Sequence, residues 1–225
     1  TSPSGLAGLP TDFTRFRSNF WAFVARNELW VSDGTQAGTR RVLQSAVQPF
    51  RLTALGSDLL FFAHTRTHGI ELMRTDGTPQ GTRLVLDIAP GQLSSATRRA
   101  SQSMDRMTVL NGRAYFGASQ SSVDQQLWST DGTALGTKRV TDLAPGPNDG
   151  TPRFLVHSIG RVFTVTAERP AAVWISDGTA VGTQLVRRFP EVLAMEPIAT
   201  GVAIHTGDGL WISSGTQATT VRVTT

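Results

Sequence analysis

Residues 72–82 read LMRTDGTPQGT, and residues 127–137 read LWSTDGTALGT. The same pattern returns as LWVSDGTQAGT at 29–39, VWISDGTAVGT at 173–183 and LWISSGTQATT at 210–220. Each copy has one apolar anchor residue, and the five anchors are Trp30, Met73, Trp128, Trp174 and Trp211. Successive anchors lie 43, 55, 46 and 37 residues apart. Repeats of about 40 residues are typical of propeller blades and of some helical repeats.

The composition around each copy favours β structure. Val, Thr, Phe, Trp and Leu alternate with Gly and Asn turns, and no helical periodicity is present. In the second unit we expect strands at 51–55, 59–64, 71–75 and 83–88, with a turn at 56–58. Five units of four strands, each a meander, predict an all-β, five-bladed β-propeller with four antiparallel strands per blade.

The repeat also divides the chain. We expect an N-terminal extension at 1–11 and one propeller domain at 12–225, with blades at about 12–48, 49–91, 104–146, 152–190 and 191–225. The second strands align as WAFVA (21–25), LFFAH (60–64), AYFGA (114–118), VFTVT (162–166) and VAIHT (202–206). We expect the first and last units each to hold their own four strands, so the ring should close by packing the first blade on the fifth.

The repeated residues have a structural interpretation. Asp33, Asp76, Asp131 and Asp177 can each accept a backbone N–H two residues on, and the glycine that follows can adopt a positive φ. One aspartate per loop is a poor calcium site, because calcium takes six to eight oxygen ligands. The anchor side chains should wedge between blades. The fifth copy has Ser214 in place of Asp and Thr219 in place of Gly, which we interpret as decay of the last repeat.

This pattern resembles the bacterial ELWxxDGT-repeat proteins. The second unit matches best, with Phe61-Phe62, Glu71-Leu72, Asp76-Gly77-Thr78, Gly81-Thr82 and Asp87-Ile88. The resemblance covers nearly all of residues 12–225, with Met73 for Trp as a departure. It implies an exported or cell-surface bacterial protein, and it implies no particular activity.

Composition excludes several classes of site. The chain has no cysteine, so disulfides, zinc–thiolate sites and thiol nucleophiles are excluded. No apolar run reaches the ~18 residues of a membrane span, and no signal segment opens the chain. The net charge is +4, and Lys138 is the only lysine. The arginine doublets are scattered and form no stripe, so we expect no nucleic-acid partner.

Variable loops should carry any binding function. The loops between second and third strands, and those between blades, should emerge on the face opposite the Asp-Gly-Thr loops, and variable loops on a rigid scaffold often bind ligands. The candidate binding residues on this face are Arg26, His64, Arg66, His68, Asp124, Glu168, Arg169 and Asp208.

We predict a non-catalytic, exported binding propeller that recognises a glycan or a surface protein, with no cofactor. His64 and His68 lack an evident third ligand, so no metal site is assigned. No motif marks catalytic residues. Two alternatives remain open: a hydrolase or lyase that uses acids such as Glu168 and Asp208 at the channel mouth, or a structural module of a larger surface assembly.

Overall fold

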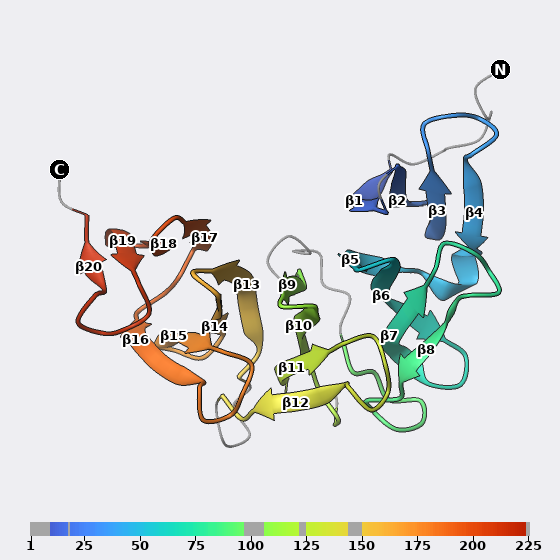
Figure 1. The fold of residues 1–225 in the computed structure, drawn as a ribbon. Helices are drawn as coiled ribbons and strands as arrows, with labels where there is room; N and C mark the ends of the chain where they lie inside the picture. The colour runs from blue at the N-terminus through green and yellow to red at the C-terminus, as the bar shows by residue number, and fades with distance from the viewer. Residues whose placement is uncertain (1–9, 18, 97–105, 122–124, 144–149, 224–225) are drawn as a thin grey trace.

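The computed structural model describes residues 10–17, 19–96, 106–121, 125–143 and 150–223. Within this part the chain forms five antiparallel sheets of four strands, each in simple chain order. Figure 1 shows the sheets side by side along an arc, with the first strand of each sheet toward the centre and the last at the rim. The predicted all-β propeller fold, with five blades of four strands, is confirmed.

The first sheet holds β1 (Thr11–Phe16), β2 (Phe20–Ala25), β3 (Glu28–Ser32) and β4 (Arg40–Leu43), and a short 3-10 turn follows at Ser45–Val47. The second holds β5 (Phe50–Leu55), β6 (Asp58–Thr65), β7 (Gly69–Thr75) and β8 (Arg83–Leu86). The third holds β9 (Thr108–Leu110), β10 (Arg113–Ala118), β11 (Gln126–Thr130) and β12 (Lys138–Thr141). The fourth holds β13 (Pro152–Ser158), β14 (Arg161–Thr166), β15 (Ala171–Ser176) and β16 (Gln184–Phe189). The fifth holds β17 (Ala194–Ile198), β18 (Gly201–Thr206), β19 (Gly209–Ser213) and β20 (Val221–Arg222).

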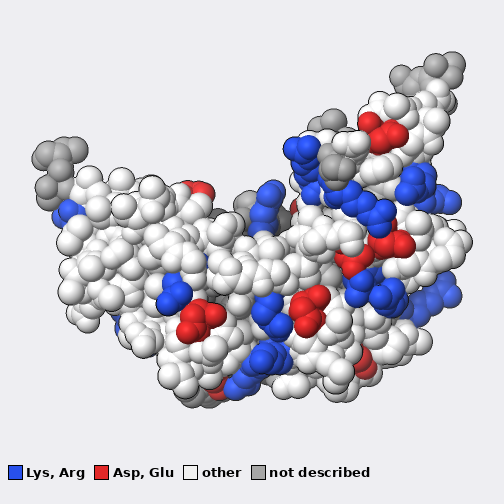
Figure 2. Space-filling model, in the orientation of Figure 1, with Lys and Arg blue, Asp and Glu red and all other residues white. Residues whose placement is uncertain are grey.

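The ring is not closed. The first and fifth sheets lie at opposite ends of the arc (Figure 1), and the space-filling view shows the same opening between them (Figure 2). The expectation that the first blade packs on the fifth is therefore wrong. Side chains wedged between neighbouring sheets set the turn from one blade to the next, and the four turns made here do not complete a circle.

The strand register corrects one sequence alignment. Each anchor on the third strand lies opposite one residue of the second strand: Phe23 opposite Trp30, Phe61 opposite Met73, and Phe116 opposite Trp128. In the second blade the equivalent segment is therefore 59–63 and not 60–64. The sequence does not reveal this one-residue shift, because Leu59-Leu60 and Phe61-Phe62 are pairs of identical residues. The two members of each pair point to opposite faces of the sheet and pack on different blades.

Each blade has two different faces. We call the face that carries the anchor the leading face, and the opposite one the trailing face. The trailing face carries the residue before the anchor and one valine of the last strand. These trailing-face residues are Leu29, Leu72, Leu127, Val173 and Leu210, with Val42, Val85, Val140, Val186 and Val223.

The core consists of four inter-blade layers, each joining the trailing face of one blade to the leading face of the next. In the first layer, Val24 and Leu29 pack with Phe61 and Met73. The later layers contain Trp128, Trp174 and Trp211 in turn. The predicted wedge role is confirmed for these four anchors. Trp30 belongs to the leading face of the first blade, which has no blade in front of it.

The Asp-Gly-Thr loops are turns held by hydrogen bonds within each loop, and Arg40 and Arg74 also donate to the Gly77 and Gly132 carbonyls of the next blade. In the second blade, Asp76 Oδ1 accepts the Thr78 N–H at 2.9 Å and the Thr78 hydroxyl at 2.6 Å. Gly77 has φ +90°. Thr78 Oγ1 in turn accepts the Gly81 N–H at 3.0 Å. The loops of the first, third and fourth blades repeat these bonds, so the predicted Asx-turn is confirmed at Asp33, Asp131 and Asp177.

These bonds have an electrostatic consequence. The hydrogen bonds from Thr78 hold the pKa of Asp76 below its usual value, and the equivalent threonines lower the pKa of the other three loop aspartates. The second glycine of the motif leaves room for the carboxylate, because a Cβ on Gly81 would overlap the Asp76 side chain.

The fifth loop is a matched replacement and not a simple loss. Ser214 removes the carboxylate, and Thr219 occupies the position of the glycine that made room for it. Thr219 Oγ1 now accepts the Thr216 N–H at 3.2 Å, as Asp76 Oδ1 accepts the Thr78 N–H in the second blade. The Thr219 hydroxyl thus replaces the missing carboxylate as the acceptor for this N–H.

Candidate functional site

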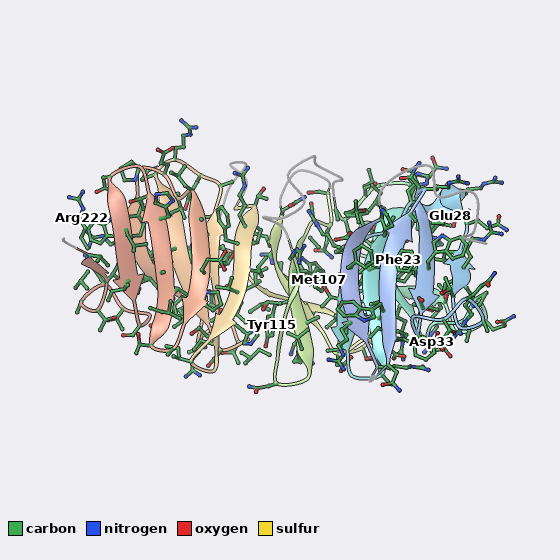
Figure 3. All side chains as sticks on the ribbon, turned by 90° about the horizontal axis from the view of Figure 1, so that it is seen from above. Phe23, Glu28, Asp33, Met107, Tyr115 and Arg222 are labelled. Carbon is green, nitrogen blue, oxygen red and sulfur yellow. The ribbon has the colours of Figure 1, made fainter. Side chains whose placement is uncertain are left out.

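The loops lie on two opposite sides of the arc, as the sequence predicts. Figure 3 shows Glu28, at the start of β3, and Asp33, just after its end, at opposite sides of the first blade. The Asp-Gly-Thr loops follow the third strand, so they occupy the side of Asp33. The loops that join second to third strands occupy the side of Glu28, which we call the variable side.

The variable side contains a pocket of about 350 Å³ between the fourth and fifth blades. This volume is within the range of ~300–1,000 Å³ that is usual for ligand sites. The wall consists of the inner strand β13, the end of β14 with the turn that follows it, and the connection between the two blades. The lining residues are Arg153, Phe154, Val165, Thr166, Ala167, Glu168, Arg169, Ala171, Pro190, Glu191, Val192 and Leu193.

A β-bulge shapes the inner wall. The register between β13 and β14 shifts between Arg153 and Val156, and Phe154 adopts φ +50°. Thr164 Oγ1 donates a hydrogen bond to the Arg153 carbonyl at 2.9 Å, which holds the bulge in place. On the other side, the Leu193 N–H donates to the His205 carbonyl at 2.8 Å and fixes the inter-blade connection. Two half-buried side chains, Arg153 and Phe154, thus face the pocket.

The charges of the pocket are only partly paired. Glu168 Oε1 accepts from Arg188 Nη1 at 2.8 Å and from the Thr166 hydroxyl at 3.1 Å, so this carboxylate is already satisfied. Within the part of the chain that the structure describes, Arg153 and Arg169 make no ion pair, and neither does Glu191. The pocket therefore presents two unpaired guanidinium groups and one unpaired carboxylate beside the apolar side chains of Phe154, Val165 and Leu193.

Two of the predicted binding residues, Glu168 and Arg169, line this pocket. Arg26, Arg66 and Asp208 are exposed on other turns, and His64 is exposed near the end of β6. His68 is partly buried, and its Nδ1 lies 2.7 Å from the Thr67 hydroxyl. Asp124 lies outside the described residues. The structure thus brings one pair of the predicted set into the pocket, and it places His64, Arg66 and His68 together on the β6–β7 hairpin.

Sequence reasoning did not find Arg153, Phe154 or Glu191. Arg153 lies within an inner strand, where a lone arginine carries no motif, and the bulge that exposes it has no signature in the sequence. Glu191 lies in a short connection that lacks the Pro-Gly of the repeat. The one available signal was the departure of this connection, PEVL at 190–193, from the pattern of the second and third units.

The two acids considered for hydrolysis are both engaged in their own turns. Asp208 Oδ1 accepts the Thr206 hydroxyl at 2.5 Å, and this bond holds the pKa of Asp208 below its usual value. Glu168 makes the ion pair described above. A general acid needs a raised pKa. The lowered pKa of Asp208 therefore does not suit a general acid.

A second hollow of about 230 Å³ lies at the third blade, lined by Gln120, Ser121, Gln126, Trp128 and Arg139. Among the described residues, no group of three or more His, Asp or Glu side chains lies close enough to hold a metal ion. The same part of the chain contains no helix with the length and apolar character of a membrane span.

No protein-family model matches the sequence, and no curated protein matches it. Solved structures do resemble the fold. YCF48 from Cyanidioschyzon merolae matches with a TM-score of 0.59 at 9% identity, over 98% of this chain and 73% of that one. A puromycin-hydrolyzing peptidase of Mycobacterium tuberculosis matches with a TM-score of 0.60 at 14% identity, over 87% of this chain and 34% of that one. The computationally designed protein Ika8 matches with a TM-score of 0.54 at 17% identity, over 95% of this chain and 57% of that one.

These likenesses define the class of fold: the chain is a β-propeller domain. At identities below 20% they carry no information about ligand or activity. All three structures are longer than this chain, which spans 57% of Ika8 and 34% of the peptidase.

Proposed function

We propose that the chain is a non-catalytic binding module that holds an acidic glycan in the pocket between the fourth and fifth blades. The observation that carries the proposal is the pair of arginines, Arg153 and Arg169, which line the pocket without a carboxylate partner among the described residues. A guanidinium group binds a carboxylate through two parallel hydrogen bonds, which gives both affinity and orientation.

The rest of the pocket suits a sugar ring. Phe154 and Leu193 offer an apolar wall for the C–H face of a ring, and Glu191 offers an acceptor for its hydroxyl groups. Glu168 is neutralised by Arg188 at 2.8 Å, so it does not cancel the attraction of the two arginines for an acid. An exported or surface location, which the family resemblance implies, belongs to the same proposal and is checked by fractionating the cells that make the protein.

The test is a glycan array that pairs each uronic or sialic acid with its neutral counterpart. We expect saturable binding to an acidic subset, reduced at least tenfold in the double variant Arg153→Gln/Arg169→Gln. The matched control is Arg83→Gln, which removes an exposed arginine from the second blade and should leave binding unchanged.

Equal binding of acidic and neutral glycans would refute the proposal, and so would unchanged binding by the double variant. Steady release of cleaved sugar from a bound glycan would instead support the hydrolase alternative. In that case Glu168→Gln should abolish release while the fold persists.

A further inference from the structure

The two ends of the arc expose the kind of surface that the four inter-blade layers bury. On the leading face, Trp21 occupies the position of Leu59, Ala114, Val162 and Val202 in the other blades. Those four residues are at most 1% exposed, whereas Trp21 is 49% exposed. Phe13 is 55% exposed beside it, and its ring stacks on that of Phe23 with centroids 5.3 Å apart. Figure 3 looks toward the opening and shows Phe23 on the first blade.

The trailing face of the fifth blade shows the matching loss of burial. Leu29, Leu72, Leu127 and Val173 are fully buried, whereas the equivalent Leu210 is 44% exposed. The valine of the last strand is at most 7% exposed in the first four blades, and Val223 is 43% exposed. Ile212 and Val221 extend the same apolar surface, at 36% and 48% exposure.

The first glycine of each Asp-Gly-Thr or Ser-Gly-Thr loop indicates independently that the leading face of the first blade is uncovered. A Cβ built on Gly77, Gly132, Gly178 or Gly215 would meet a side chain of the preceding blade, namely Phe16, Leu55, Tyr115 and Ile175 in turn. A Cβ on Gly34 would meet nothing within 4 Å. The first blade therefore has an empty place at the point where every other blade packs against the preceding blade.

We propose that this empty place is filled by a second copy of the chain, whose fifth blade packs its trailing face on the leading face of the first blade. The layer between the fourth and fifth blades provides the template. In that layer Ile175 contacts Gly215 and the Arg187 guanidinium donates to the Thr220 carbonyl at 3.3 Å. Ile212 is the equivalent of Ile175, so in the assembly it should contact Gly34 of the second copy.

The size of the face fits a weak association. The strands are four to six residues long in the first blade and two to six in the fifth, so four strands at a spacing of ~4.8 Å make faces of at most about 20 Å by 20 Å. The flat area is on the order of 400 Å² per copy, about half of the ~800 Å² per partner of a standard interface, so we expect an association that depends on concentration. Because the two faces differ, the contact is head to tail, and copies can continue to add unless the ring closes.

The test uses two variants that each block one face. Trp21→Glu blocks the leading face, and Leu210→Glu blocks the trailing face. Sedimentation velocity of the unaltered chain should show mass rising with concentration through dimers and larger species. Each variant alone should remain a monomer. An equimolar mixture should form dimers and nothing larger, because each variant still has one intact face and the two intact faces are complementary.

The matched control is Leu135→Glu, which places the same charge at a 99% exposed leucine in the loop of the third blade and should assemble like the unaltered chain. Circular dichroism checks that all variants keep their sheets. A monomeric unaltered chain at all concentrations overturns the proposal, and so does a mixture of the two variants that stays monomeric. Association that persists in either single variant also overturns it.

Discussion

The Ser214-Gly215-Thr216 loop of the fifth blade suggests a direct experiment on the Asp76-Gly77-Thr78 loop of the second. If Ser214 and Thr219 are a matched replacement, then Asp76→Ser and Gly81→Thr should each destabilise the protein alone and compensate for each other together. Both positions belong to one loop, and the anchor Met73 and the core around it are unchanged by the exchange. The experiment therefore isolates the loop.

The magnitudes follow from the contacts. Asp76→Ser removes two hydrogen bonds to Thr78, of 2.9 and 2.6 Å, at a partly exposed site, so we expect a loss of about 1 kcal/mol. Gly81→Thr places a side chain where the Asp76 carboxylate lies, so it displaces the carboxylate and adds strain, for about 2–3 kcal/mol. In the double variant the new hydroxyl accepts the Thr78 N–H, and the loss should fall to about 1 kcal/mol. The coupling is then about 2–3 kcal/mol, within the range measured for contacting residues.

Urea unfolding of the four proteins measures this coupling. Fluorescence and circular dichroism should give coincident transitions, so that one free energy of unfolding describes each protein. Losses that add to within about 0.5 kcal/mol would refute the compensation, because they would show that the two sites act independently. The reverse exchange, Ser214→Asp with Thr219→Gly, tests the same reasoning in the fifth blade and should be close to neutral.

Three further predictions concern the core. Glu71 is fully buried, and its carboxylate accepts hydrogen bonds from the N–H groups of Ile88, Ala89 and Ser95 at 3.0–3.2 Å. In urea titrations, Glu71→Ala should lower the free energy of unfolding by about 3–5 kcal/mol, whereas Glu71→Gln should lower it by less than about 1.5 kcal/mol. Burial raises the pKa of Glu71, so the folded state holds the proton more tightly than the unfolded state. Relative to the Glu71→Gln variant, the unaltered protein should therefore lose stability as pH rises above the ordinary pKa of 4.5. Urea midpoints from pH 4 to 8 measure this, and the same pH dependence in both proteins would contradict it. Trp128→Ala should lower the free energy of unfolding by about 3–5 kcal/mol, because Trp128 is buried between two blades. Trp30→Ala, measured at concentrations low enough to keep the chain monomeric, should lower it clearly less. Equal losses of stability would mean that the leading face of the first blade is covered.

The blade count, the strand count and the loop chemistry could all be predicted from sequence, because each depends on local contacts. Asp76 and Thr78 are two residues apart, and the bond between them needs nothing from the rest of the fold. The register of β6 could not be predicted in the same way. Leu59-Leu60-Phe61-Phe62 is apolar at every position because both faces of the strand are buried, so the alternation that normally fixes register is absent.

The pocket was predictable only in part, for a different reason. Glu168 and Arg169 belong to a turn after a strand, where exposed polar residues are expected to be available for binding. Arg153 reaches the same pocket from a bulge in an inner strand, and Glu191 reaches it from the connection to the next blade. Their proximity depends on how two blades pack, which no single unit of the repeat encodes.

The open ring shows a further limit of repeat analysis. Trp30 and Trp128 occupy the same position of the same motif, yet Trp128 lies within an inter-blade layer and Trp30 lies on an end face. The motif specifies how a blade packs against the preceding blade, and the same residues are present whether or not there is a preceding blade. A repeat can therefore predict every internal interface of a propeller while leaving the closure of the ring undetermined, since closure depends on the sum of the angles between blades. The same uniformity makes the end faces complementary to each other, which is why a second copy is the partner that the exposed residues fit.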